Sequence, residues 1–91
     1  MTYAKKTDKN QTEIVEALRA VGVDVYITSD VGRGFPDLVC GYDGKTYLLE
    51  IKTMKGRMTD SEKAFHTCWK GHCAVVRNVQ QALKVCGIEV E

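Results

Sequence analysis

Two carboxylates and one amine are the residues of this 91-residue chain that are best placed to do chemistry. Asp37 closes the run Gly34-Phe35-Pro36-Asp37, which holds the only proline, and Glu50 and Lys52 follow in Glu50-Ile51-Lys52. Carboxylate oxygens favour Mg²⁺ or Mn²⁺ over zinc. Such an ion polarises a phosphoryl oxygen and activates water, and a nearby ammonium group can orient that water and offset transition-state charge. These residues therefore predict a divalent-metal site that hydrolyses a phosphodiester.

A hairpin between the two motifs predicts how they meet. Asp43-Gly44 is the dipeptide that favours a two-residue turn, so Tyr42 should pair with Lys45. Counting back along both strands then sets Asp37 directly opposite Glu50, with Cβ atoms roughly 4.5–5.5 Å apart. Lys52 points to the same face, because side chains alternate along a strand. We expect the metal ligands to be Asp37, Glu50 and the backbone carbonyl of Ile51.

The elements around the hairpin indicate an α/β fold. Three capping boxes mark helix starts, and each is followed by an apolar stripe at helical spacing. The boxes are Asp8 with Gln11, Thr59 with Glu62, and Asn78 with Gln81. In the same order, the apolar stripes that follow them are Ile14, Ala17, Leu18 and Val21; Phe65, Cys68, Trp69 and His72; and Val79, Ala82, Leu83 and Cys86. Strands are expected at 23–28, 38–40, 46–52 and 73–77. The order is α-β-β-β-α-β-α, and apolar residues on both faces of the hairpin predict a central sheet flanked by helices on both sides.

Composition sets the outer limits of the interpretation. The chain should form one domain over residues 1–91, with residues 1–7 fraying. Apolar residues make up 44% and charged residues 27%, and the net charge is +1. No apolar run is long enough for a membrane span, and we expect the N-terminal residues not to act as a signal peptide, because no apolar segment follows their lysines. Four cysteines without CxxC spacing favour a reducing, cytoplasmic compartment. Because the net charge is small, contact with nucleic acid must come from local basic residues, for which the candidates are Arg33, Lys55, Arg57, Lys5 and Lys6.

Two plainer interpretations compete with the metal site. Asp37, Glu50 and Lys52 could form a solvated cross-strand salt bridge on a surface hairpin. That arrangement is disfavoured because Val39 and Leu48 should share their face, and buried charges are costly unless they are paired or bound to metal. A zinc site built from His66, Cys68, His72 and Cys73 is a weaker candidate, because the spacing fits no zinc pattern and Cys68 is expected in the core with Phe65 and Trp69.

The motifs resemble the PD-(D/E)XK nuclease signature and, more closely, a stand-alone VRR-NUC domain of the type found in bacteriophages. The resemblance spans about residues 8 to 83. It rests on Asn10-Gln11-Thr12-Glu13-Ile14-Val15, Gly34-Phe35-Pro36-Asp37-Leu38, Leu49-Glu50-Ile51-Lys52, and Thr59-x-x-Glu62-x-x-Phe65 with Trp69-Lys70-Gly71. It implies a restriction-endonuclease-like αβββαβ core, with a further helix here, and a central mixed sheet.

The resemblance also implies an activity. It predicts Mg²⁺- or Mn²⁺-dependent cleavage of DNA by homodimers acting on branched structures such as four-way junctions, in a bacterial or phage-infected cell and without an organic cofactor. Asp37 and Glu50 would be metal ligands and Lys52 the catalytic lysine. Gln11 stands where the family has an acidic residue in the first helix; it could assist through a metal-bound water, serve as the capping partner of Asp8, or do both. With Gln11 in this position the site has one carboxylate fewer, which favours one metal ion over two. The same difference leaves a non-catalytic DNA-binding module as the competing function.

Overall fold

The computed structural model describes residues 9–89, so the expected fraying of residues 1–7 lies outside the described part of the chain. Within it, the elements are α1 (Lys9–Ala20), β1 (Asp24–Ile27), β2 (Leu38–Tyr42), β3 (Lys45–Ile51), α2 (Asp60–Cys68), β4 (His72–Val76) and α3 (Val79–Val85). This is the predicted order. The strands form a four-stranded mixed sheet in the order β1-β2-β3-β4, in which β3 and β4 are parallel and the other neighbours antiparallel. No helix in residues 9–89 is long and apolar enough to cross a bilayer.

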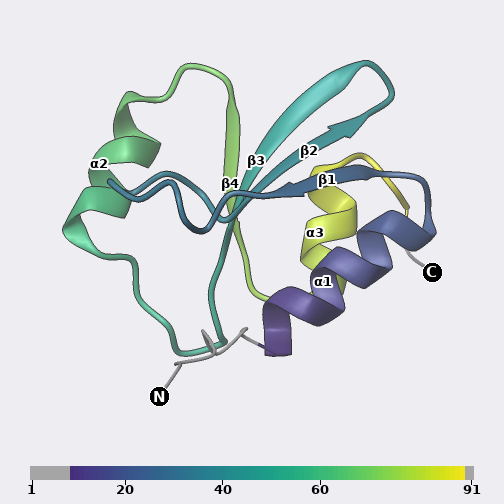
Figure 1. Ribbon diagram of the computed structural model, residues 1–91, viewed down its shortest axis with the longest axis horizontal. Helices are drawn as coiled ribbons and strands as arrows, with labels where there is room; N and C mark the ends of the chain where they lie inside the picture. The colour runs from purple at the N-terminus through teal and green to yellow at the C-terminus, as the bar shows by residue number, and fades with distance from the viewer. Residues whose placement is uncertain (1–8, 90–91) are drawn as a thin grey trace.

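Helices lie on both sides of the sheet, as predicted, but they cover its two faces very differently. Figure 1 shows α1 and α3 together on one side and α2 on the other. The hydrophobic core lies under α1 and α3, where Ile14, Leu18, Leu38, Cys40, Leu49, Val76 and Ala82 are completely buried. By contrast, α2 contributes no fully buried residue. The face under α2 is therefore the more open of the two.

The hairpin follows the predicted register. Asp43 and Gly44 have φ angles of 52° and 75°, as the two-residue turn requires. The pairs run from Tyr42 with Lys45 to Leu38 with Leu49, which makes Asp37 and Glu50 the next pair. The side chains also divide between the faces as expected, because Leu38, Cys40, Tyr47, Leu49 and Ile51 all belong to the core under α1 and α3.

The first helix is shorter than its predicted apolar stripe. Ile14 and Leu18 are buried, but the third buried residue is Val15, whereas Val21 is 44% exposed. The helix ends at Ala20 and the chain turns before β1, so Val21 leaves the helical stripe. In the last helix the predicted N-cap is confirmed, because the Asn78 side chain accepts a hydrogen bond from the Gln81 N–H. The reciprocal half of the predicted capping box differs, because the Gln81 side chain accepts from the Arg77 N–H and not from that of Asn78.

The predicted burial along the second helix was wrong. Thr59 and Glu62 form the expected capping box, but Cys68 is exposed and Trp69 is 44% exposed. The Trp69 ring stacks on that of half-buried Phe65, with 5.2 Å between centroids. The helix ends before Trp69, and the Phe65 ring also lies 5.3 Å from the ring of Phe35. This helix is held to the sheet by a few specific contacts rather than by a broad apolar face.

Candidate active site

The chain's only proline shapes the end of the hairpin. Backbone hydrogen bonds in an antiparallel pair come at alternate positions, and the register makes Pro36 opposite Ile51 the next such position after Leu38 and Leu49. Proline has no N–H to donate to the Ile51 carbonyl. The other backbone group of Ile51 that faces this strand, its N–H, donates to Asp37 Oδ2 at 2.8 Å. The site thus receives a carboxylate and a strand-end carbonyl that proline cannot pair.

Asp37 and Glu50 face each other at a position without backbone hydrogen bonds, where opposed side chains lie closest. Glu50 is 2% exposed, and its Oε1 has no hydrogen-bond partner among residues 9–89. The pKa of Glu50 is raised to about 9, chiefly by burial and then by the neighbouring Asp37 and Glu62 carboxyl groups, and Lys52 only partly offsets this rise. The site as it stands is therefore short of positive charge.

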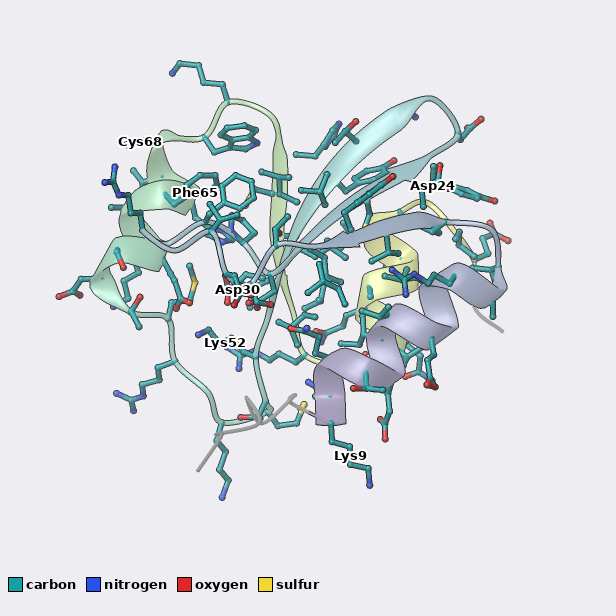
Figure 2. The ribbon with its side chains drawn as sticks, in the orientation of Figure 1. Lys9, Asp24, Asp30, Lys52, Phe65 and Cys68 are labelled. Atoms are coloured by element: carbon teal, nitrogen blue, oxygen red, sulfur yellow. The ribbon has the colours of Figure 1, made fainter. Side chains whose placement is uncertain are left out.

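Lys52 lies between two acidic side chains. Its Nζ is 2.8 Å from Glu62 Oε1 and 3.7 Å from Glu50 Oε2. Burial alone would lower the pKa of Lys52, but the ion pair with Glu62 raises it overall; burial would likewise raise the pKa of Glu62, but Lys52 and the Thr59 N–H lower it. Figure 2 shows Lys52 in the space between α2 and the N-terminal end of α1. It is held as a cation.

Glu62 is a site residue that the sequence analysis missed. It was recognised only as the second member of a helix-capping box, a role it does perform, because its Oε1 accepts a hydrogen bond from the Thr59 N–H at 2.8 Å. The same oxygen contacts Lys52. A signal was present in the sequence, since the capping box puts Glu62 in the first turn of the helix that follows the Lys52 strand.

A close backbone contact sets α2 against the motif loop. Gly34 has a φ of +80°, and a Cβ at this position would stand 2.2 Å from the carbonyl oxygen of Ser61 and 2.9 Å from the nitrogen of Glu62. Any larger residue would push away the turn that carries Glu62.

Substituting Gly34 should therefore test this docking. Gly34→Ala is expected to lower the stability by at least about 2 kcal/mol more than Gly32→Ala, measured by urea denaturation. Gly32 is a matched control because its φ is +79° but nothing lies within 4 Å of its Cβ position. Equal losses in the two variants would mean that the backbone conformation, and not the contact with Ser61, explains the glycine.

The end of β3 is also anchored from the other side of the sheet. The Asn10 side chain donates to the carbonyls of Lys52 (3.0 Å) and Arg77 (3.2 Å). Arg77 in turn donates to the carbonyls of Thr53 and Gly56. The backbone at Lys52 is thus fixed by α1 and by the end of β4.

Gln11, the expected first-helix member of the site, is half-buried and faces the loop between β1 and β2. Its Oε1 accepts a hydrogen bond from Ser29 Oγ at 3.1 Å. Its predicted capping partner, Asp8, lies outside the described residues. The residue before Gln11 in the helix, Asn10, is the one that contacts the Lys52 backbone.

Three of the five basic residues expected to contact DNA, Arg33, Lys55 and Arg57, lie in two exposed loops. Arg33 has a φ of 57° and directly precedes Gly34, so its loop rests on the first turn of α2. Lys55 and Arg57 are exposed in the loop after β3, which Arg77 holds at Gly56. Lys5 and Lys6 lie outside residues 9–89.

The zinc alternative is not supported by the described residues. His66 lies 3.5 Å from Cys73 Sγ, but Cys68 is exposed and the His72 ring packs 5.2 Å from that of Tyr47, a core residue of the opposite face. Nowhere in residues 9–89 do three His, Cys, Asp or Glu side chains converge as a metal site. A pair of carboxylates is nevertheless a usual protein contribution to a magnesium site, which water and substrate phosphate complete.

Comparison with known proteins finds no matching family model, no matching curated protein and no matching solved structure. The functional proposal therefore rests on the residues and on the geometry described above.

Proposed function

We propose that this protein is a metal-dependent endodeoxyribonuclease with a restriction-endonuclease-like core of the VRR-NUC type. The observation that carries the proposal is the buried Glu50 carboxyl, which faces Asp37 across the hairpin and has an oxygen without a hydrogen-bond partner among the described residues. A buried carboxylate that lies beside a second acid, with one oxygen unpartnered in the described part of the chain and the other 3.7 Å from Lys52, is costly unless a cation neutralises both acids.

The donor set fits Mg²⁺ or Mn²⁺. Asp37 and Glu50 supply hard carboxylate oxygens, and Pro36 offers no N–H to the Ile51 carbonyl, so the three are the proposed ligands of one ion. When bound, that ion would polarise the phosphoryl oxygen and lower the pKa of a coordinated water.

The chain's own residues would position the water and bind the DNA. Lys52, held as an ammonium group by Glu62, would orient the attacking water and offset the negative charge that develops on the phosphate. Arg33, Lys55 and Arg57 would contact backbone phosphates, which position DNA without reading its sequence. Gln11 would assist from the first helix.

The substrate shape and the assembly are part of the proposal. We propose branched DNA, such as a four-way junction, as the substrate and a homodimer as the active form, because a two-fold assembly can present two cleavage sites to a branched molecule. The structure leaves large apolar side chains exposed that a second subunit could cover: Val21, Tyr26, Ile27, Val31, Met54 and Trp69.

One observation favours a second candidate, a DNA-binding module of the same fold that does not turn over. The first helix provides an amide, Gln11, where the resemblance predicts a carboxylate, and the oxygen of that amide accepts a hydrogen bond from Ser29 in the β1–β2 loop.

Cleavage of end-labelled junction, flap and duplex DNA with Mg²⁺ or Mn²⁺ separates the two candidates. Wild type is expected to cut the junction, and Asp37→Asn and Lys52→Ala are each expected to reduce the rate by about 10²-fold or more, because each removes a group that acts on the reacting phosphate. Thermal melting should show that both variants are folded. Tight binding to the junction without cutting under either metal would instead establish the non-catalytic module.

A further inference from the structure

A carboxylate of α2 lies against the proposed catalytic lysine. The Lys52 ammonium group is 0.9 Å closer to Glu62 than to Glu50, with distances of 2.8 and 3.7 Å. Both members of this pair are largely buried, with 16% of each side chain exposed. An ion pair shielded in this way is screened less by salt than one on the open surface.

Glu62 is itself fixed in two ways, by the capping box with Thr59 and by the contact of its backbone with Gly34. Its Oε1 accepts from the Thr59 N–H, while the Thr59 hydroxyl accepts from the Glu62 N–H at 3.2 Å. The backbone of the same turn is held against Gly34, three residues before Asp37. Glu62 thus contacts both motifs of the site, with its backbone against Gly34 and with its carboxylate at Lys52.

We propose that Glu62 is the positioning residue for Lys52, and that α2 therefore supplies the site with an acidic group although the first helix provides Gln11. Lys side chains are long and flexible, so a catalytic ammonium group needs a partner that selects one rotamer. Glu62 does this from a helix start that is rigid because it is capped. This inference rests on the proposed nuclease function for its kinetic consequences, but the contact itself can be tested without turnover.

Glu62→Gln is the sharpest variant. Its amide oxygen can still accept from the Thr59 N–H, so the capping box is kept and only the negative charge next to Lys52 is lost. We expect kcat for junction cleavage to fall by about 10- to 100-fold, as for a misplaced catalytic group. The KM for DNA and the Mn²⁺ affinity should stay within about twofold of wild type.

Two controls separate positioning from other effects. Glu16→Gln removes one negative charge from the exposed side of α1 and should leave kcat unchanged. Thr59→Ala removes the cap and should lower the melting temperature, but it leaves the Glu62 carboxylate in place and should affect kcat less than Glu62→Gln. A Glu62→Gln kcat within about twofold of wild type would overturn the proposal, as would an increase in KM with kcat unchanged.

A second measurement does not depend on cleavage. In a ¹H–¹⁵N correlation spectrum of lysine ammonium groups, wild type should show a slowly exchanging Lys52 signal, identified by its loss in Lys52→Arg, and Glu62→Gln should lose it. If wild type cuts no DNA, the proposed function fails and this signal alone decides the role of Glu62. Absence of the signal in wild type, or its persistence in Glu62→Gln, would contradict the inference.

Discussion

Glu50→Gln should abolish both Mn²⁺ binding and DNA cleavage while making the metal-free protein more stable. Glu50 is 2% exposed, and its pKa is raised to about 9 by burial and by Asp37. Near pH 7 the folded protein must therefore take up a proton that the unfolded chain has released, at a cost that glutamine avoids. We expect a gain on the order of 2 kcal/mol, or about 10 °C in Tm for a domain of this size.

The opposite signs of the two effects make this test specific. A residue that only supports the fold would lose stability and activity together, whereas a metal ligand held in an unfavourable environment loses activity and gains stability. Calorimetric titration with Mn²⁺ and thermal melting of the same preparations measure both effects. Glu16→Gln, on the exposed side of α1, is the matched control and should change neither. A Glu50→Gln protein that is less stable than wild type without metal would show that Glu50 has a structural partner.

Metal binding should release protons, and the stability of the metal-free protein should fall as pH rises. Because the folded pKa of Glu50, about 9, lies above its unfolded value, the folded state holds the extra proton between about pH 4.5 and 9. Stability linked to this group is thus fully present below about pH 4.5 and is lost progressively up to about pH 9. Saturating Mn²⁺ replaces the proton and should flatten the decline.

The proton release can be counted directly. Titrations of Mn²⁺ into wild type at pH 7 in buffers of different ionisation enthalpy should give about one proton released per ion bound. In Glu50→Gln this dependence on the buffer should disappear together with the binding. Mn²⁺ affinity that is the same at pH 6 and pH 8 would mean that Glu50 is already ionised before the metal arrives.

Local sequence signals were sufficient for the hairpin and for most helix starts. Asp43-Gly44 determines a two-residue turn, the turn determines a register, and the register determines which side chains oppose one another, so the pairing of Asp37 with Glu50 follows from the sequence. The same holds for the Thr59 and Asn78 caps, because a cap depends on residues only three positions apart. These inferences use short-range geometry alone.

The errors fall where burial depends on contacts distant in sequence. Helical spacing placed Trp69 and Cys68 in the core, but α2 ends at Cys68 and has no broad apolar surface to pack against. Val21 was likewise assigned to the core by periodicity and is exposed, because α1 stops one residue before it. Periodicity identifies a face of a helix but does not say what covers it.

The sequence by itself determined the two carboxylates, the lysine, the turn that brings them together and the α/β order of the elements. Only the tertiary structure decided that Glu50 is buried with an oxygen unpartnered among residues 9–89, that Lys52 lies closer to Glu62 than to Glu50, and that Asn10 rather than Gln11 holds the Lys52 backbone. The reason is physical. Pairing across a hairpin follows from the local backbone, whereas burial, the pKa of a carboxyl group and the partner of a lysine depend on which distant segments, here α2 and the start of α1, pack against it.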